Sequence, residues 1–108
     1  MKYNIYAGVS NEFGGEDYHF TSEFPNEEEA IRAAQATAID CYESYEGIHD
    51  LKSFYDVAID LGYESDEDIE QNQEEIQNIY EDLRNERLEY EAIPTEEDDL
   101  NEKFLNIV

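Results

Sequence analysis

The sequence is short of basic residues. It has only 6 lysines and arginines against 30 aspartates and glutamates, which gives a formal net charge of −24 over 108 residues. A protein that binds a phosphate backbone needs Lys and Arg to displace the counterions, so we expect no direct binding to nucleic acid. The same shortage disfavours docking on anionic membrane surfaces.

Cysteine is almost absent as well. Cys41 stands alone, so the chain has no internal disulfide and no CxxC metal motif, and a reducing compartment fits. No apolar run approaches the length of about 18 residues that a membrane span needs, and residues 1–6 lack the apolar segment of a secretion signal. We therefore expect a soluble protein of the cytoplasm.

The length predicts one acidic α+β domain over residues 1–108. Two domains of about 54 residues each, without a disulfide or a metal, would have too little core. The apolar fraction of 40%, with 9 tyrosines and 5 phenylalanines, is enough for one modest core. The charge run Glu96–Asp99 and the mixed segment after it predict that residues 96–108 form a flexible or partner-ordered tail.

Three segments alternate apolar and polar side chains with the period of two that is typical of strands. They cover residues 2–9, 17–24 and 88–93. Gly14 and Gly15 supply the backbone freedom for a turn between the first two, and Pro94 ends the third. We expect one small antiparallel sheet of three strands.

Three helices are predicted between the second and third strands, at residues 26–45, 53–61 and 66–87. In the first, small side chains recur every four residues and predict close packing against the sheet: Ala30, Ala34 and Ala38. Ser53 is the expected cap of the second helix, and Ser65 or Asp66 that of the third. The expected order is ββαααβ, with the three helices packed on one face of the sheet.

The third helix combines an apolar line with two acidic rows. The apolar positions predicted to be buried are Ile69, Ile76, Tyr80 and Leu83. On one continuous helix, four glutamates fall within a stripe of about 60° on the opposite side: Glu67, Glu70, Glu74 and Glu81. The candidate partner-binding residues from the two acidic rows are Glu67, Glu70, Glu74, Glu75, Glu81, Asp82 and Glu86.

On an ordinary helix such rows would be a solvated face. A small domain needs a net charge of only about 2–8 for solubility, and like charges oppose compaction. An excess of this size indicates either a basic partner or a high-salt cytoplasm. Glu outnumbers Asp 20 to 10, which argues against halophilic composition. Crowded carboxylates also predict that stability increases as pH falls and as salt rises.

Catalysis and metal binding have little support in the sequence. Counting an EF-hand from Asp66 places Gln71 where that loop requires glycine, and Gly14-Gly15 lacks the spacing of a phosphate-binding loop. His49 would activate Cys41 only if the fold brought them together. We expect no enzymatic activity, no metal and no cofactor.

Four tyrosines surround the loop at residues 47–53 in the sequence: Tyr42, Tyr45, Tyr55 and Tyr63. Tyrosine is enriched at binding surfaces, so these residues predict an aromatic interface patch. Tyrosines that seal a thin core explain the same pattern, and the sequence leaves both interpretations open.

Four segments carry a resemblance to known proteins. They are YAG at residues 6–8, FGG at 13–15, EEEA at 27–30 and YESYEGIH at 42–49. Over residues 2–62 the chain resembles small proteins of tailed bacteriophages, which implies a phage origin and the cytoplasm of a host bacterium. The resemblance implies no activity, because that group has no agreed function. In size and charge the chain is also similar to phage DNA mimics of the anti-restriction and anti-CRISPR type.

Together these patterns predict a non-enzymatic phage inhibitor that acts by acidic nucleic-acid mimicry. Its partner would be a basic nucleic-acid-binding host protein, such as a CRISPR effector or a restriction enzyme. The alternatives are a structural or regulatory phage protein that binds another basic protein, and an acid-adapted halophilic domain of unrelated function. The oligomeric state is left open by the sequence.

Overall fold

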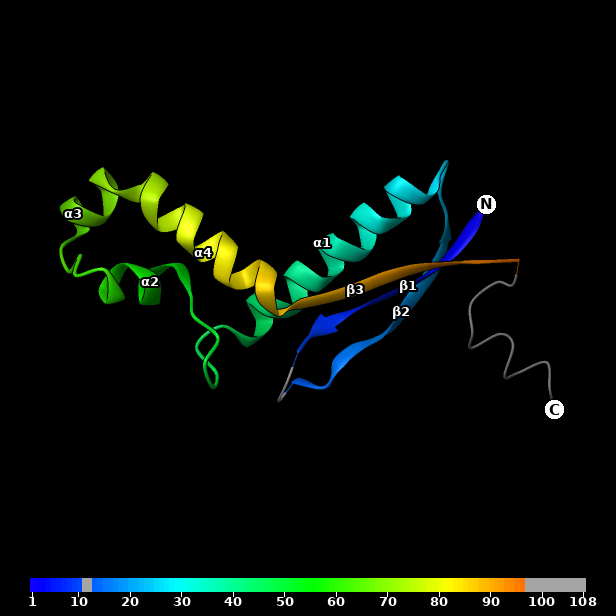
Figure 1. Ribbon diagram of the computed structural model, residues 1–108, viewed down its shortest axis with the longest axis horizontal. Coiled ribbons are helices and arrows are strands. Elements are labelled where there is room, and N and C mark those ends of the chain that lie inside the picture. Colours follow the sequence, from blue (N-terminus) through cyan, green and yellow to red (C-terminus); the bar gives the residue numbers. More distant parts are fainter. Residues whose placement is uncertain (11–12, 97–108) are drawn as a thin grey trace. The chain divides into compact units, whose positions relative to one another are not determined.

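The computed structural model describes residues 1–10 and 13–96. The described chain divides into two compact units, one formed by residues of Met1–Cys41 with those of 88–96, the other by Tyr42–Arg87. The α+β class is confirmed (Figure 1). The elements in chain order are β1 (Lys2–Val9), β2 (Gly15–Glu23), α1 (Glu27–Tyr45), α2 (Phe54–Asp60), α3 (Asp66–Gln71), α4 (Gln73–Arg87) and β3 (Leu88–Thr95).

The described residues thus form four helices where the sequence predicted three, so the order is ββααααβ. The single domain over residues 1–108 stays a prediction. Of the predicted tail, residues 97–108 lie outside the described part of the chain, and so does most of the charge run that begins at Glu96.

The sheet has the order β2-β1-β3, and both neighbours of β1 are antiparallel to it. β1 lies in the centre because its alternate side chains are the apolar ones and are buried: Tyr3, Ile5, Ala7 and Val9. Pro94 was expected to end β3, yet it lies within the strand, opposite Tyr3. Proline is tolerated there because β3 is an edge strand of this sheet, so the backbone groups along one of its sides form no hydrogen bonds to a neighbouring strand.

The β1–β2 ladder contains a β-bulge. Ile5 pairs with Phe20 and Tyr6 with Tyr18, so His19 is the extra residue between them. Further along, the two strands approach so closely at Gly8 that a Cβ there would lie 1.9 Å from the carbonyl oxygen of Gly15. Only glycine fits this position without a backbone shift.

One helix, α1, covers the sheet in the first unit. Its Ala30 and Ala34 form a buried cluster with Tyr3 and Ile5, and partly buried side chains pack around that cluster: Phe20, Phe24 and Ala92. The predicted alanine line is confirmed, since Ala30, Ala34 and Ala38 are all fully buried. The predicted count of three helices is not exact, and α2, α3 and α4 belong to the second unit.

The second unit has its own core. Tyr42 and Tyr80 meet edge to face with 6.2 Å between ring centroids, and both are buried together with Leu51, Val57 and Ile76. Ser53 caps α2 as predicted: its hydroxyl accepts from the Asp56 N–H, and the Asp56 carboxylate accepts from the Ser53 N–H. This reciprocal capping stabilises a helix of only seven residues.

The predicted continuous helix over residues 66–87 is wrong, because Asn72 divides it into α3 and α4. Asn72 leaves helical geometry at φ −117° and ψ 20°. Its side-chain Nδ2 donates to the carbonyl of Asp68 at 2.8 Å, and its backbone N–H donates to the same carbonyl at 3.2 Å. Asparagine competes in this way for backbone groups and so ends helices. The acidic rows therefore lie on two successive helices, and the single stripe that assumed one helical phase is not formed.

The apolar line of α4 is confirmed at Ile76 and Tyr80 and wrong at Leu83, whose exposed fraction is 37%. Leu83 lies beside an open hollow of about 310 Å³ that is also lined by Tyr42, Leu51 and Arg87. Nothing in the second unit fills this space, so one side of the Leu83 side chain is left uncovered.

Two matched substitutions on α4 test this core. Ile76→Ala should lower the free energy of unfolding by about 2–5 kcal/mol, because the side chain is fully buried. Leu83→Ala should cost less than about 1.5 kcal/mol, because part of that side chain already contacts water. Urea denaturation of both variants measures the difference, and a larger loss for Leu83→Ala would contradict this description of the core.

Candidate functional site

The structure places the predicted partner-binding residues on two helices of the second unit. Glu67 and Glu70 lie on α3; on α4 lie Glu74, Glu75, Glu81, Asp82 and Glu86. Six of the seven are exposed, and Glu81 is half-buried. We call these seven residues the acidic surface.

These side chains face solvent because the helix turns its apolar side chains into the core. α4 turns Ile76 and Tyr80 into the core, and Glu74 and Glu81, seven residues apart, share another face of the helix. The Glu81 carboxylate accepts a hydrogen bond from the Gln77 side chain at 3.1 Å, and the Glu75 carboxylate accepts one from the Tyr63 hydroxyl at 3.1 Å. These neutral donors orient two carboxylates without cancelling their charge.

The cations of the second unit are engaged elsewhere. Arg87, with its side chain 15% exposed, pairs with Asp50 at 2.9 Å, and Lys52 pairs with Asp60. The guanidinium of Arg84 lies over the Tyr80 ring, 5.7 Å from its centroid. Among the described residues, none of the seven carboxylates of the acidic surface forms an ion pair.

These pairs also shift the protonation equilibria of their own members. The hydrogen bond from Arg87 lowers the pKa of Asp50, and the hydrogen bond to Asp60 raises the pKa of Lys52. Asp50 therefore remains ionised to lower pH, and Lys52 to higher pH, than isolated side chains would. The three basic residues of Tyr42–Arg87 are thus engaged with groups outside the acidic surface and leave it unneutralised.

A buried hydroxyl positions α4. The Tyr80 hydroxyl donates a hydrogen bond to the carboxylate of Glu46, and the Tyr42 hydroxyl donates to the carbonyl of Lys52 at 2.8 Å. Burial, followed by the hydrogen bond to Glu46, raises the pKa of Tyr80, so this hydroxyl keeps its proton at physiological pH. The acidic surface is therefore presented on a helix that is fixed by both packing and hydrogen bonds.

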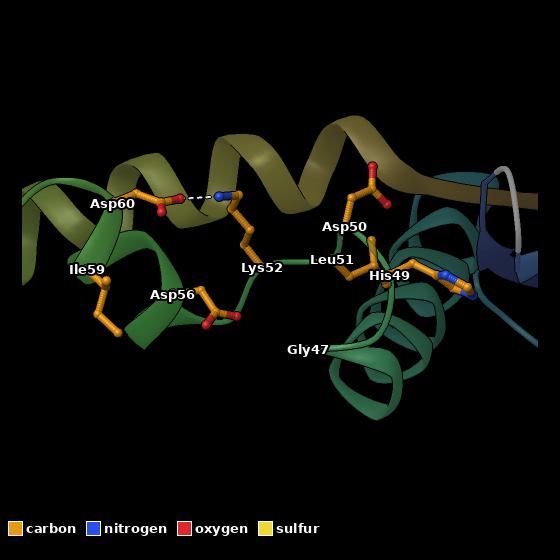
Figure 2. A pocket seen from close by; sticks show the side chains of 8 residues that line it. All are labelled: Gly47, His49, Asp50, Leu51, Lys52, Asp56, Ile59 and Asp60. Carbon is orange, nitrogen blue, oxygen red and sulfur yellow. Dashed lines mark hydrogen bonds and ion pairs between the residues drawn. The ribbon is translucent and has the colours of Figure 1, made fainter.

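A hollow of about 460 Å³ lies in the second unit beside residues 47–60 (Figure 2). The loop before α2 turns through Gly47 at φ 82° and His49 at φ 54°, and the Gly47 N–H donates to the carbonyl of Leu51 at 2.9 Å. In Figure 2 Lys52 extends to Asp60, whereas His49 points away from both. The hollow is lined by ion-paired and apolar side chains, and among these lining residues no nucleophile lies next to a base. Such a lining suits contact with the side chains of another molecule.

The histidine that lies next to the thiol of Cys41 within the first unit is His19, which the sequence did not single out; His49, the histidine considered from the sequence, belongs to the second unit. Cys41 Sγ is 3.8 Å from Nε2 of His19, which is also 3.0 Å from the carbonyl oxygen of Ala7. Because a carbonyl only accepts, Nε2 carries the proton and cannot serve as a base for the thiol. Burial, followed by the charges of Asp40 and Asp17, raises the pKa of Cys41. This thiol is not activated.

A second group of carboxylates, which the sequence reasoning missed, lies on the sheet. Glu16 on β2 and Glu89 on β3 both pair with Gly8, and Glu91 on β3 pairs with Tyr6. A hydrogen bond with Glu91, together with partial burial and the charges of Glu91 and Glu89, raises the pKa of Glu16 to about 7. The alternation of Glu89 and Glu91 along β3 placed both on one face, but only the strand order brings Glu16 next to them.

Within the described residues, no helix is both long enough and apolar enough to cross a membrane, and no three His, Cys, Asp or Glu side chains are grouped to hold a metal ion. Comparisons of the chain with protein-family models, with curated proteins and with solved structures found no match.

The carboxyl pair on the sheet predicts a pH dependence of stability. Folded Glu16 keeps its proton up to about pH 7, whereas its ordinary pKa is 4.5, so the folded state binds more protons between these values. Stability should therefore rise as pH falls from about 8 to about 5. Glu16→Gln should weaken this rise and stabilise the fold above pH 7 by less than about 1 kcal/mol, because the group is exposed and screened.

Thermal melting at several pH values measures this effect. Glu23→Gln, also at an exposed position of β2, is the matched control and should leave the slope below about pH 7 unchanged, since Glu23 pairs only with the N-terminal ammonium. A Glu16→Gln variant whose melting temperature follows the wild-type pH profile would show that the carboxyl pair does not govern it.

Proposed function

We propose that this chain is a phage-encoded, non-enzymatic inhibitor that occupies the basic nucleic-acid channel of a host protein. A CRISPR effector, a restriction enzyme or another DNA-binding protein offers such a channel, and the carboxylates of the acidic surface take the place of phosphates. One observation carries this proposal: seven carboxylates on α3 and α4 form no ion pair among the described residues, while the nearby cations are engaged with other groups.

Carboxylates are suitable substitutes for phosphates in such a channel. Both are acceptor-only anions at neutral pH, and arginine binds both through two parallel hydrogen bonds. The 15 residues of α4 rise about 22 Å and carry five of the seven carboxylates. The mean spacing of about 4.5 Å is somewhat wider than the roughly 3.4 Å between phosphates along one DNA strand.

The helix break at Asn72 also bends the acidic surface. α3 and α4 meet at an angle (Figure 1), so the acidic surface follows a bent path. Nucleic acids are frequently bent where proteins bind them, and a channel adapted to a bent duplex would accept this path. The proposed target class is therefore a protein whose basic channel changes direction.

The energetics favour a basic partner as well. Unpaired like charges repel one another in the free protein, and a groove lined by Arg and Lys relieves that repulsion. Complementary charge also accelerates encounter between the partners, more strongly at low salt than at high salt. A complex of this kind forms quickly and weakens steeply as salt is added.

A pull-down from a bacterial host lysate at low and high salt tests the proposal. We expect nucleic-acid-binding proteins to be enriched at low salt and lost at high salt. Enrichment of a neutral or acidic phage component, unaffected by salt, would contradict mimicry and support a structural role.

A charge reversal tests whether the acidic surface makes the contact. Glu70→Lys with Glu74→Lys changes the local charge from −2 to +2 on either side of Asn72, and both side chains are exposed, so the fold should tolerate the change. Association with the captured partner should slow by at least about tenfold at low salt, because like charges then face the basic groove. Stopped-flow association rates and circular dichroism measure binding and folding.

The matched control reverses two exposed glutamates that lie outside α3 and α4. Glu23→Lys with Glu43→Lys changes the net charge of the chain by the same amount and should slow association much less. Equal slowing by both pairs would mean that only net charge matters, and an unchanged rate for Glu70→Lys with Glu74→Lys would remove the acidic surface from the interface.

A further inference from the structure

The outer face of α2 carries two large apolar side chains that face solvent. Tyr55 is 64% exposed and Ile59 is 60% exposed. They are four residues apart, so their side chains are neighbours on the helix surface. Val57 and Ala58 are the buried residues of α2, so α2 is held in the unit by other residues and the outer pair contributes little to folding.

This apolar surface extends to Phe54 at the start of the helix. The rings of Phe54 and Tyr55 meet edge to face with 5.6 Å between centroids. Phe54 lines a hollow of about 460 Å³ together with Gln73, Glu74 and Gln77, and Ile59 lines the hollow shown in Figure 2. We call Phe54, Tyr55 and Ile59 the apolar strip. It links two hollows in a chain whose mean hydropathy is −0.82.

Carboxylates flank the apolar strip. Asp56 and Asp60 lie on α2 next to Tyr55 and Ile59, and Glu74 lies in the same hollow as Phe54. Asp60 is bonded to Lys52, but both side chains are about half exposed, and such surface pairs are weak enough to exchange partners. An incoming cation therefore meets carboxylates on both sides of an apolar centre.

We propose that the apolar strip is the anchor for a basic protein surface that combines arginines with a protruding apolar side chain. The apolar side chain packs against Ile59 in the hollow of Figure 2. An arginine stem lies across the Tyr55 ring, where cation–π attraction holds the guanidinium, and its donors reach Asp56 or Asp60. Aromatic side chains within an interface of this kind commonly provide most of the binding energy.

Charge selects this occupant over a second copy of the chain. Two copies would bring two bodies of net charge −24 together, with carboxylates facing carboxylates beside the strip, and such contacts cost several kcal/mol. A basic partner meets the same surface with complementary charge.

The inference rests on the proposed function and divides the work of binding between two surfaces. The acidic surface attracts the partner over a distance and determines the association rate. The apolar strip acts after contact, is insensitive to salt, and determines how long the complex lasts. The two contributions can therefore be separated by measuring rates at different salt concentrations.

The test uses two synthetic peptides of equal length with the same number of arginines, one with leucine and one with alanine at the other positions. At about 0.1 M salt both should bind the full chain, and at about 1 M salt, where charges are screened, only the leucine peptide should remain bound. Tyr55→Ser with Ile59→Ser should weaken binding of the leucine peptide on the order of tenfold, mainly through faster dissociation. It should weaken binding of the alanine peptide less, because that peptide loses only the cation–π contact with Tyr55.

Ile31→Ser, which alters an apolar residue 39% exposed on α1, is the matched control and should bind both peptides like the wild type. Circular dichroism confirms that each variant is folded. The inference would be overturned if the Tyr55→Ser, Ile59→Ser variant bound the leucine peptide as tightly as the wild type does. It would also be overturned if the wild type bound the two peptides with equal affinity at about 1 M salt. Sedimentation that shows a wild-type dimer, lost in the same variant, would assign the strip to a second copy and overturn it as well.

Failure of mimicry gives a different result. In that case the pull-down would enrich a neutral or acidic component regardless of salt, whatever the strip variant does with the two peptides. If only the strip variant then lost its binding to the leucine peptide, the apolar strip would be a docking site that does not depend on nucleic-acid mimicry.

Discussion

Thirty carboxylates share this chain with six basic side chains, and their mutual repulsion opposes every step of compaction. The described structure places its few cations where they stabilise the fold most directly. Arg32 pairs with Glu28 and Glu29 at the start of α1, where three acids already meet the positive end of the helix dipole. Arg87 pairs with Asp50 within the second unit. Most of the other carboxylates that the structure describes lie at exposed positions, whereas Glu16 shares a hydrogen bond with Glu91 on the sheet.

Two small cores hold against this repulsion. In the first unit the alanines of α1 allow close approach to β1, so dispersion contacts are gained without bulky side chains. In the second unit Tyr42 and Tyr80 bury their rings and still satisfy their hydroxyls, through the carbonyl of Lys52 and the carboxylate of Glu46. As a result, more than half of the exposed residues of α3 and α4 are acidic, which is the feature that the proposed function uses.

Hydrophobic periodicity predicted the structure correctly where the local sequence pattern and the tertiary environment agreed. The three strands, the alanine line of α1, the Ser53 cap and the burial of Ile76 were all predicted from the sequence and are confirmed. Four features could not be predicted from periodicity, because they depend on contacts between distant residues or on competition for backbone groups. These are the break at Asn72, the uncovered side chain of Leu83, the bulge that brings His19 to Cys41, and the strand order that brings Glu16 to Glu91. The residues of the candidate site were proposed from the sequence and stay a prediction, and their division over two helices was not foreseen.

The central claim is that the acidic surface and a nucleic acid compete for the same groove, and displacement tests this most directly. A fluorescently labelled copy of the full chain is bound to its captured target, and duplex DNA is added in increasing amounts while the anisotropy of the label is followed. The account predicts that DNA releases the labelled chain completely, with no species that contains both. A stable ternary complex of target, DNA and chain would contradict it, because two ligands that use one groove cannot be bound together.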